Sequence, residues 1–206
     1  MDKLFVIFNP AARGEKSLRA RRFLESKSDP SITLAPTRHS GEAQSLAARA
    51  IEDGYKVIVA AGGDGTINEV VNGIGTSGVP LGVLPLGTVN VFAHELRIPR
   101  TLEAAWAVIL GGNTRTIDLA QSRANHATRY FVQLAGVGFD AHAVRAASWE
   151  LKKRIGPLSY VWAGIKALSR THPPIEIWTN GKLFCPPSIP NLDALPEKFE
   201  MLRIGH

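Results

Sequence analysis

The sequence predicts an α/β fold, in which a parallel sheet with flanking helices is followed by a partial, mainly β second domain. Three observations support this. Short apolar runs alternate with segments of helical spacing through the first half of the chain, and such alternation is typical of parallel sheets. The alternation stops near Gly112, where strand-like runs follow one another. Farther along, Asn180–Gly181 separates two more such runs, and this dipeptide is a strong hairpin signal.

Four apolar runs predict the strands of the parallel sheet. Leu4–Phe8 is continuously apolar, as in a strand covered on both faces. Ser31–Ala35 is a weaker run, Lys56–Ala61 leads into a glycine cluster, and Val79–Gly87 ends in a proline and a glycine. Ligands of such sheets bind at the carboxyl ends of the strands, so we expect a site where these runs end.

Helices are expected between and after these strands. Ser40 is placed to cap the second helix, Gly73 and Gly75 to end the third, and Gly111–Gly112 to end the fourth. The apolar residues at helical spacing are, in chain order, Ala20, Phe23 and Leu24; Ala43, Leu46, Ala47, Ala50 and Ile51; Ile67, Val70, Val71 and Ile74; and those within Thr101–Leu110.

The second half has a different pattern. The runs RTIDLAQ and RYFVQLA predict paired strands, Phe139–Ser169 predicts a helical insertion, and Ile175–Phe184 predicts a hairpin. The stretch from Cys185 to His206 has four prolines and little periodicity, which predicts a poorly ordered tail. We place a domain boundary near Gly112. The predicted domains are an α/β domain over residues 1–112 and an incomplete β-rich domain over residues 113–206.

Composition narrows the partners and the compartment. The net charge of +6 favours anionic partners. Cys185 is the one cysteine, which excludes an internal disulfide and fits a reducing compartment. The apolar run in Met1–Phe8 is too short for a signal peptide, and no run approaches the roughly 20 apolar residues of a spanning helix. We expect a cytoplasmic protein, or one bound peripherally to the inner face of the membrane.

The segment Gly62-Gly63-Asp64-Gly65 follows a predicted buried strand. Glycines allow positive φ and close approach to a ligand, and the helix that we expect to open at Thr66 offers free N–H groups to a phosphate. A bare carboxylate would repel that phosphate. Either Mg²⁺ bridges the two, or Asp64 accepts the proton of an attacking nucleophile. Both alternatives predict phosphoryl transfer.

Two other interpretations compete with this one. In the first, the glycine turn is purely structural, and Asp64 or Thr66 caps the helix. In the second, Gly136–Ala141 forms a dinucleotide site, because it matches the Gly-x-Gly-x-x-Ala pattern. The region after it lacks the second strand and the acidic residue that such a site requires, so we interpret it as a tight turn.

Six segments occur in an order known from one family. They are Asn9–Gly14 (NPAARG), Thr37–Ala43 (TRHSGEA), Gly62–Glu69 (GGDGTINE), Pro85–Asn90 (PLGTVN), Ile117–Asp118 and Ala135–Ala141 (AGVGFDA). This ordered set resembles the diacylglycerol kinase catalytic-domain superfamily of lipid kinases, which includes bacterial diacylglycerol kinase-like proteins and sphingosine kinases. The set is more specific than any one of its parts.

The resemblance implies an ATP-dependent kinase that uses Mg²⁺ and phosphorylates a lipid hydroxyl, diacylglycerol-like or sphingoid-like, at the membrane surface. It implies that Asp64 is a catalytic or metal-associated carboxylate. Asp118 either contacts the metal or only terminates a strand. No nucleic-acid partner is expected, and the oligomeric state stays open, with a dimer as one form to test. The implied nucleotide-binding residues are Asn9, Pro10, Ala11, Ala12, Arg13, Thr37, Gly62, Gly63, Asp64, Gly65, Thr66, Ile67, Asn68, Glu69, Thr88 and Asn90.

The sequence departs from the family in three places. Val91 stands where the family often has aspartate, the later acidic Asp-Gly segment is absent, and the stretch after Phe184 is unlike the family. We therefore expect a chain shortened at its C-terminus. Two alternatives stay open: an inactive nucleotide- or lipid-binding fragment, and a soluble-substrate kinase of the NAD kinase or phosphofructokinase type. Aromatic residues near Lys152–Arg154 are compatible with a bilayer-facing surface or with a helix packed on the β domain.

Overall fold

The computed structural model describes residues 3–10, 15–27, 29–124, 127–133, 175–179, 182–185 and 197–204. Contacts divide the chain into two compact units, and each is described by itself. The first runs to Leu119 and takes in Tyr130–Gln133, while the second contains Ala120–Arg129 and the strands that follow. The predicted domain boundary near Gly112 stays a prediction, because a division by contacts does not test it.

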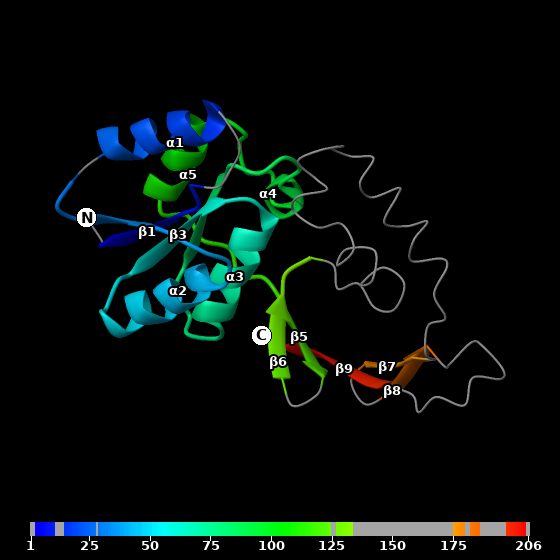
Figure 1. Cartoon of the computed structure of the whole chain (residues 1–206). Helices are drawn as coiled ribbons and strands as arrows, with labels where there is room; N and C mark the ends of the chain where they lie inside the picture. The colour runs from blue at the N-terminus through cyan, green and yellow to red at the C-terminus, as the bar shows by residue number, and fades with distance from the viewer. Residues whose placement is uncertain are drawn as a thin grey trace. The chain divides into compact units, whose positions relative to one another are not determined.

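The first unit contains the predicted parallel sheet (Figure 1). Its strands are β1 (Leu4–Phe8), β2 (Ile32–Pro36), β3 (Val57–Gly62) and β4 (Leu81–Pro85), in the order β2-β1-β3-β4. All three strand pairs are parallel, and every residue of β1 is buried. The continuous apolar run therefore belongs to a strand covered on both faces, which confirms the predicted fold class.

Helices cover both faces of this sheet (Figure 1). The first face carries α1 (Glu15–Ser26) and α5 (Leu102–Leu110), and the second carries α2 (Glu42–Glu52) and α3 (Asp64–Ile74). Alternate residues of β1 supply the two cores: Val6 packs with α1 and α5, whereas Ile7 packs with α2 and α3. A short helix that the sequence analysis did not predict, α4 (Val91–Glu95), follows β4.

The prediction that Gly73 ends α3 is wrong. The helix continues to Ile74, and Gly75 is its C-cap residue. Gly73 lies where α2 crosses α3: a Cβ atom there would lie 2.3 Å from the backbone oxygen of Gln44 and 2.6 Å from the Cβ of Ala47. Only glycine lets the two helices approach this closely, so the residue serves packing rather than termination.

The prediction that Ser40 caps α2 is also wrong. The N-cap residue is Gly41, in the left-handed region with φ of 86°, and it makes no side-chain cap hydrogen bond. The backbone N–H of Ala43, in the first turn of α2, instead donates to a carboxylate oxygen of Glu69 on α3. The acceptor comes from another helix, so no local pattern around Ser40 reveals it.

The second unit contains a mixed sheet of five strands in the order β6-β5-β9-β7-β8. The predicted hairpin strands, β7 and β8, pair antiparallel. The predicted disordered tail is wrong for β9, which pairs parallel with β7. The predicted helix over Phe139–Ser169 lies outside the described residues. The strands are β5 (Leu119–Ala124), β6 (Ala127–Phe131), β7 (Ile175–Thr179), β8 (Lys182–Cys185) and β9 (Glu197–Ile204).

Among the described residues, no helix combines the length and apolar character that crossing a membrane requires.

Replacing Gly73 with alanine tests the helix contact. The new Cβ would meet a backbone oxygen, and such overpacking costs about 1–3 kcal/mol, partly offset by the helix propensity of alanine, about 1 kcal/mol better than glycine. We expect Gly73→Ala to unfold at a lower urea concentration than the wild type, as followed by circular dichroism. Gly65→Ala, in the same helix, is the matched control because a Cβ there meets nothing within 4 Å. Equal midpoints for the two variants would contradict the close packing.

Candidate functional site

Four loops meet at the carboxyl edge of the parallel sheet. Backbone hydrogen bonds join them in pairs: Thr37 N–H donates to the Phe8 carbonyl (2.8 Å), Asn9 N–H to Ala61 (3.0 Å) and Leu86 N–H to Gly62 (2.9 Å). Because all four strands point the same way, the segments that follow them lie along one edge. The predicted site residues that the structure describes, apart from Asp118, follow these four strands.

The glycine turn differs from the prediction in two ways. Helix α3 begins at Asp64 rather than Thr66, with Gly63 as its extended N-cap residue (φ −91°, ψ −174°) and no side-chain cap. Gly62, Gly63 and Gly65 are not among the glycines with positive φ. The turn is therefore an extended strand end that passes directly into a helix. Asp64 lies in the first helical turn, where a carboxylate interacts favourably with the helix dipole.

Close backbone contacts explain the glycines. A Cβ on Gly62 would lie 2.5 Å from Oγ1 of Thr66, and a Cβ on Gly87 would lie 2.7 Å from the Cα of Gly63. No side chain fits between the loop after β3 and the loop after β4. Gly65 is different, because a Cβ there meets nothing within 4 Å. The backbone of Gly65 therefore borders open space.

Asp64 is half-buried and accepts two hydrogen bonds on the same oxygen. The backbone N–H of Phe92, in α4, donates to Oδ1 over 3.3 Å, and Nε2 of Gln133 donates to it over 3.2 Å. Within the described part of the chain, no hydrogen bond reaches Oδ2. The alternative in which Asp64 caps α3 is therefore wrong, because its carboxylate contacts the start of α4 instead.

Two other predicted nucleotide-binding side chains hold loops together. Nδ2 of Asn9 donates to Oγ1 of the buried Thr66 over 3.1 Å. Asn90 has a left-handed backbone (φ 54°, ψ 55°), and its amide brackets Gly87: Oδ1 accepts from the Gly87 N–H (2.7 Å), and Nδ2 donates to the Gly87 carbonyl (2.8 Å). These side chains fix the shape of the edge.

Glu69 lies farther along α3 and faces α2. One oxygen accepts from the Ala43 N–H (3.2 Å), and the other from Oγ of Ser40 (3.3 Å). At the start of α2, Glu42 is buried and accepts from the guanidinium of Arg38 (2.7 and 2.9 Å) and from its backbone N–H. These bonds from Arg38 lower the pKa of the Glu42 carboxyl from 4.5 to about 2. The loop that carries the buried Thr37 is therefore fixed by carboxylates at both ends.

The remaining predicted residues occupy varied positions. Ile67 is fully buried in the core, so its side chain serves packing. Pro10, Asn68, Thr88 and Asp118 are exposed. Four further predictions fall outside the described residues. They concern nucleotide binding by Ala11, Ala12 and Arg13, the candidate dinucleotide turn at Gly136–Ala141, the AGVGFDA segment, and the aromatic residues near Lys152–Arg154.

A metal cluster made by protein side chains alone is absent from the described residues. No group of three or more His, Cys, Asp and Glu side chains within them could hold a metal ion. Magnesium often binds through one or two carboxylates together with substrate phosphates and water. Asp64, with oxygen Oδ2 free of hydrogen bonds in the described part, fits that second kind of site.

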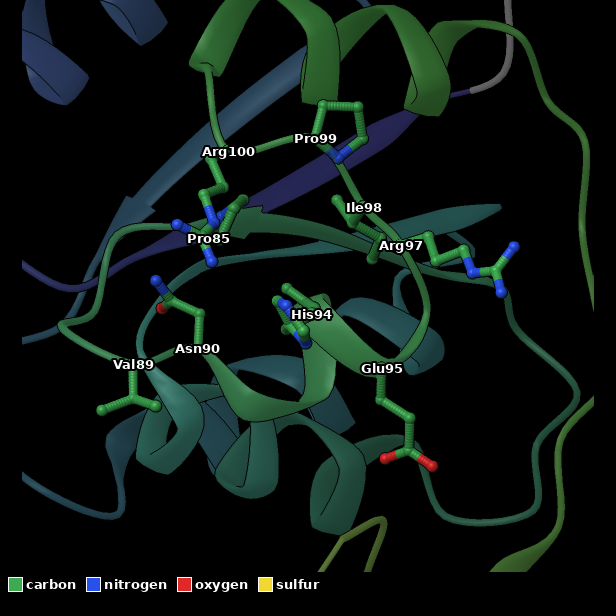
Figure 2. A pocket seen from close by; sticks show the side chains of 10 residues that line it. Pro85, Val89, Asn90, His94, Glu95, Arg97, Ile98, Pro99 and Arg100 are labelled. Carbon is green, nitrogen blue, oxygen red and sulfur yellow. The ribbon is translucent and has the colours of Figure 1, made fainter.

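A pocket of about 600 Å³ lies beyond Asn90, between the end of β4, α4 and the segment that leads to α5. Figure 2 shows the Arg100 side chain reaching toward Pro85. The His94 side chain lies between α4 and the segment that leads to α5, while Glu95 and Arg97 point outward. Asp64 does not line this pocket.

Comparison with known proteins identifies the family. Residues 3–122 match the profile described as the diacylglycerol kinase catalytic domain. The chain belongs to the diacylglycerol kinase catalytic domain family. Two curated relatives named diacylglycerol kinase, from Staphylococcus saprophyticus and Staphylococcus aureus, are 33% and 34% identical to it over 168 residues, which is 79% of this chain and 54% and 52% of theirs. The chain thus spans about half the length of these relatives.

A solved structure shares the fold. A crystal structure titled as a diacylglycerol kinase from Bacillus anthracis superposes with a TM-score of 0.53 at 24% identity, covering 63% of this chain and 49% of that one. The match supports the α/β architecture of this family member and the order of its elements.

Sequence reasoning missed Gln133 and the backbone of Phe92, both of which contact Asp64. The signal for Gln133 was available, because it is a polar residue inside the apolar run YFVQLA, and a polar side chain among buried neighbours is the informative exception. The signal for Phe92 was not available, because any residue offers a backbone N–H.

The Glu42–Arg38 pair predicts a pH effect on stability. The folded pKa of Glu42 lies below its usual 4.5, so ionised Glu42 stabilises the fold above about pH 4.5, and this stabilisation is lost as the pH falls toward about 2. We expect urea midpoints of the wild type to fall more steeply over this range than those of Glu42→Gln. Glu52→Gln, exposed in the last turn of the same helix, is the control and should follow the wild type. Parallel curves for all three proteins would refute the coupling.

The Asn90 bracket predicts an ordered series of stabilities. Asn90→Ala loses two hydrogen bonds, each worth about 0.5–1.5 kcal/mol, and also places alanine in the left-handed region at a cost of about 1–2 kcal/mol. Asn90→Gly loses the same bonds without that strain. We expect the free energy of unfolding to decrease from wild type to Asn90→Gly to Asn90→Ala, measured by urea titration. A glycine variant as stable as the wild type would show that the bracket contributes nothing.

Proposed function

We propose that this chain carries the nucleotide-binding half of an ATP-dependent kinase, which transfers the γ-phosphate to a hydroxyl of a diacylglycerol-like or sphingoid-like lipid. One observation supports this above all. Asp64 stands in the first turn of α3, at the carboxyl edge of the parallel sheet, with its carboxylate oriented by two neutral N–H donors. Membership of the diacylglycerol kinase family supports the same chemistry.

The first turn of α3 is suited to phosphate. Backbone N–H groups at a helix N-terminus point at an approaching anion, and the helix dipole favours negative charge there. Gly65 lies in this turn, and a Cβ would meet nothing within 4 Å of it. A triphosphate therefore has space beside the backbone, and the neighbouring Gly63 and Gly87 present no side chain to obstruct it. Thr88 and Asn9 lie on loops at the same edge.

Magnesium fits this arrangement. The Asp64 carboxylate supplies a hard oxygen ligand, and Oδ2 makes no hydrogen bond within the described residues. When bound, the ion would offset the charge of the phosphates and of Asp64, which otherwise repel each other. Asp118 is exposed in the same unit and stays a second proposed ligand.

The proposed reaction needs one proton acceptor. The lipid hydroxyl oxygen attacks the γ-phosphorus, the bond from that phosphorus to the bridging oxygen breaks, and ADP leaves. Asp64 accepts the hydroxyl proton, or holds the cation while the proton passes to water. Most of the rate acceleration in phosphoryl transfer comes from positioning and electrostatic stabilisation, which fits a carboxylate held by fixed donors.

The chain spans about half of its curated relatives, so its own turnover is part of the proposal. Because the proposed acceptor is a lipid, the protein would bind peripherally at the cytoplasmic face of a membrane during the reaction. Val91, where the family often has aspartate, begins α4 next to Phe92, whose N–H contacts Asp64. We propose that Asp64 supplies the local carboxylate without help from this position.

Transfer of radiolabelled phosphate from ATP to a panel of lipids tests the proposal. We expect Asp64→Asn to reduce labelling by about 100-fold or more, because a positioned acid–base group contributes about 10²–10⁴. Asp53→Asn, at the exposed C-cap of α2, is the matched control and should label like the wild type.

Three outcomes would count against the proposal. Equal labelling by the wild type and Asp64→Asn would exclude the catalytic role. ATP binding without labelling of any acceptor would identify a nucleotide-binding fragment. Labelling confined to water-soluble acceptors would identify a kinase of the NAD kinase type.

A further inference from the structure

The segment Tyr130–Gln133 packs against α3, although it follows α3 by a long stretch of sequence. Asn72 on α3 brackets the backbone of Tyr130: its Nδ2 donates to the Tyr130 carbonyl (2.9 Å), and its Oδ1 accepts from the Tyr130 N–H (2.9 Å). The side chains of Tyr130 and Val132 pack against the core between the sheet and α3. This segment is therefore anchored to the first unit by both polar and apolar contacts.

The anchor directs the chain toward Asp64. From Asn72 back to Asp64, α3 covers about 12 Å at 1.5 Å per residue. From Tyr130 to Gln133, the chain can cover at most about 10 Å at 3.3 Å per residue, and it bends at Val132 and Gln133. With the length of a glutamine side chain added, a segment fixed at Asn72 can therefore reach the start of α3. Gln133 is the residue that arrives there, and its Nε2 donates to Oδ1 of Asp64 over 3.2 Å.

We propose that Gln133 is a positioning residue of the phosphoryl-transfer site, holding Oδ1 of Asp64 so that Oδ2 is presented to the cation or to the acceptor hydroxyl. This inference rests on the proposed function for its kinetic consequences, while the contact itself is independent of any activity. Phe92 N–H donates to the same oxygen, so the two donors fix the carboxylate from α4 and from the segment after β6.

The amide is chemically suited to this task. A lysine or arginine at position 133 would hold the carboxylate more strongly, but it would also offset the negative charge that a divalent cation requires. A neutral amide orients the group and leaves its charge in place. The side chain also reaches Asp64 from an anchored backbone, because the Asn72 bracket lies only three residues away.

The side-chain amide signal of Gln133 tests the contact without any assay of activity. In ¹⁵N-resolved NMR spectra of the full chain, we expect this signal to shift in Asp64→Asn. The amide of Gln121, which belongs to the second unit, is the internal control and should not respond. A Gln133 signal that is unaffected by Asp64→Asn would overturn the proposal.

Kinetics test the consequence. We expect Gln133→Leu to lower kcat about tenfold while KM for ATP changes by less than about twofold, because the carboxylate loses orientation and the nucleotide contacts remain. Gln133→Glu should lower kcat further, because a carboxylate at this position has no N–H to donate to Oδ1 of Asp64 and repels it. Gln121→Glu adds the same charge elsewhere and should behave like the wild type.

The two arms separate the two proposals. Wild-type kinetics in both Gln133 variants would overturn the positioning role, even where the NMR contact is present. Absence of lipid phosphorylation by the wild type would contradict the proposed function, and the NMR result would then decide on the contact alone. If Gln133→Leu does not fold, Gln133→Asn takes its place. It keeps the amide but shortens its reach by one methylene, so it should lower kcat about tenfold as well.

Discussion

The backbones of Gly63 and Gly87 touch, and the candidate site is arranged around that contact. A Cβ on Gly87 would lie 2.7 Å from the Cα of Gly63, so the loops after β3 and β4 meet without an intervening side chain. The Asn90 amide then fixes Gly87 from the other side, and α4 starts directly after Asn90. Together, these contacts place the Phe92 N–H beside Asp64. The carboxylate depends, through α4, on two glycines being in contact.

Neutral amides make several of the side-chain hydrogen bonds around this edge and along α3. Asn9 joins the β1 loop to Thr66, Asn90 brackets Gly87, Asn72 brackets Tyr130, and Gln133 holds Asp64. Amides donate and accept without adding net charge, so they order the edge while leaving its electrostatic field to Asp64 and the helix dipole. In the part of this edge that the structure describes, Arg38 and Glu42 form an ion pair, which lies where the β2 loop meets α2.

The sequence was informative where the physical cause is local. Apolar runs located all four strands, because a strand covered on both faces requires them, and the glycine turn marked the carboxyl edge. It failed where the cause is distant: Gly73 is set by Gln44 and Ala47, and the start of α2 by Glu69. β9 was missed because four prolines in the stretch hid the alternation of Phe199 and Met201. Gln133 contacts Asp64 across 69 positions, which no spacing rule covers.

The start of α2 has a consequence for how the protein folds. Its N-cap glycine offers no side-chain acceptor, and the acceptor for the Ala43 N–H comes from Glu69, 26 positions later. A short isolated helix with an uncapped end is marginal in water, and the Ala43 N–H gains this protein acceptor only when α2 and α3 are packed together. The start of α2, just after the loop that carries Thr37, is thus coupled to closure of the hydrophobic core on that face of the sheet.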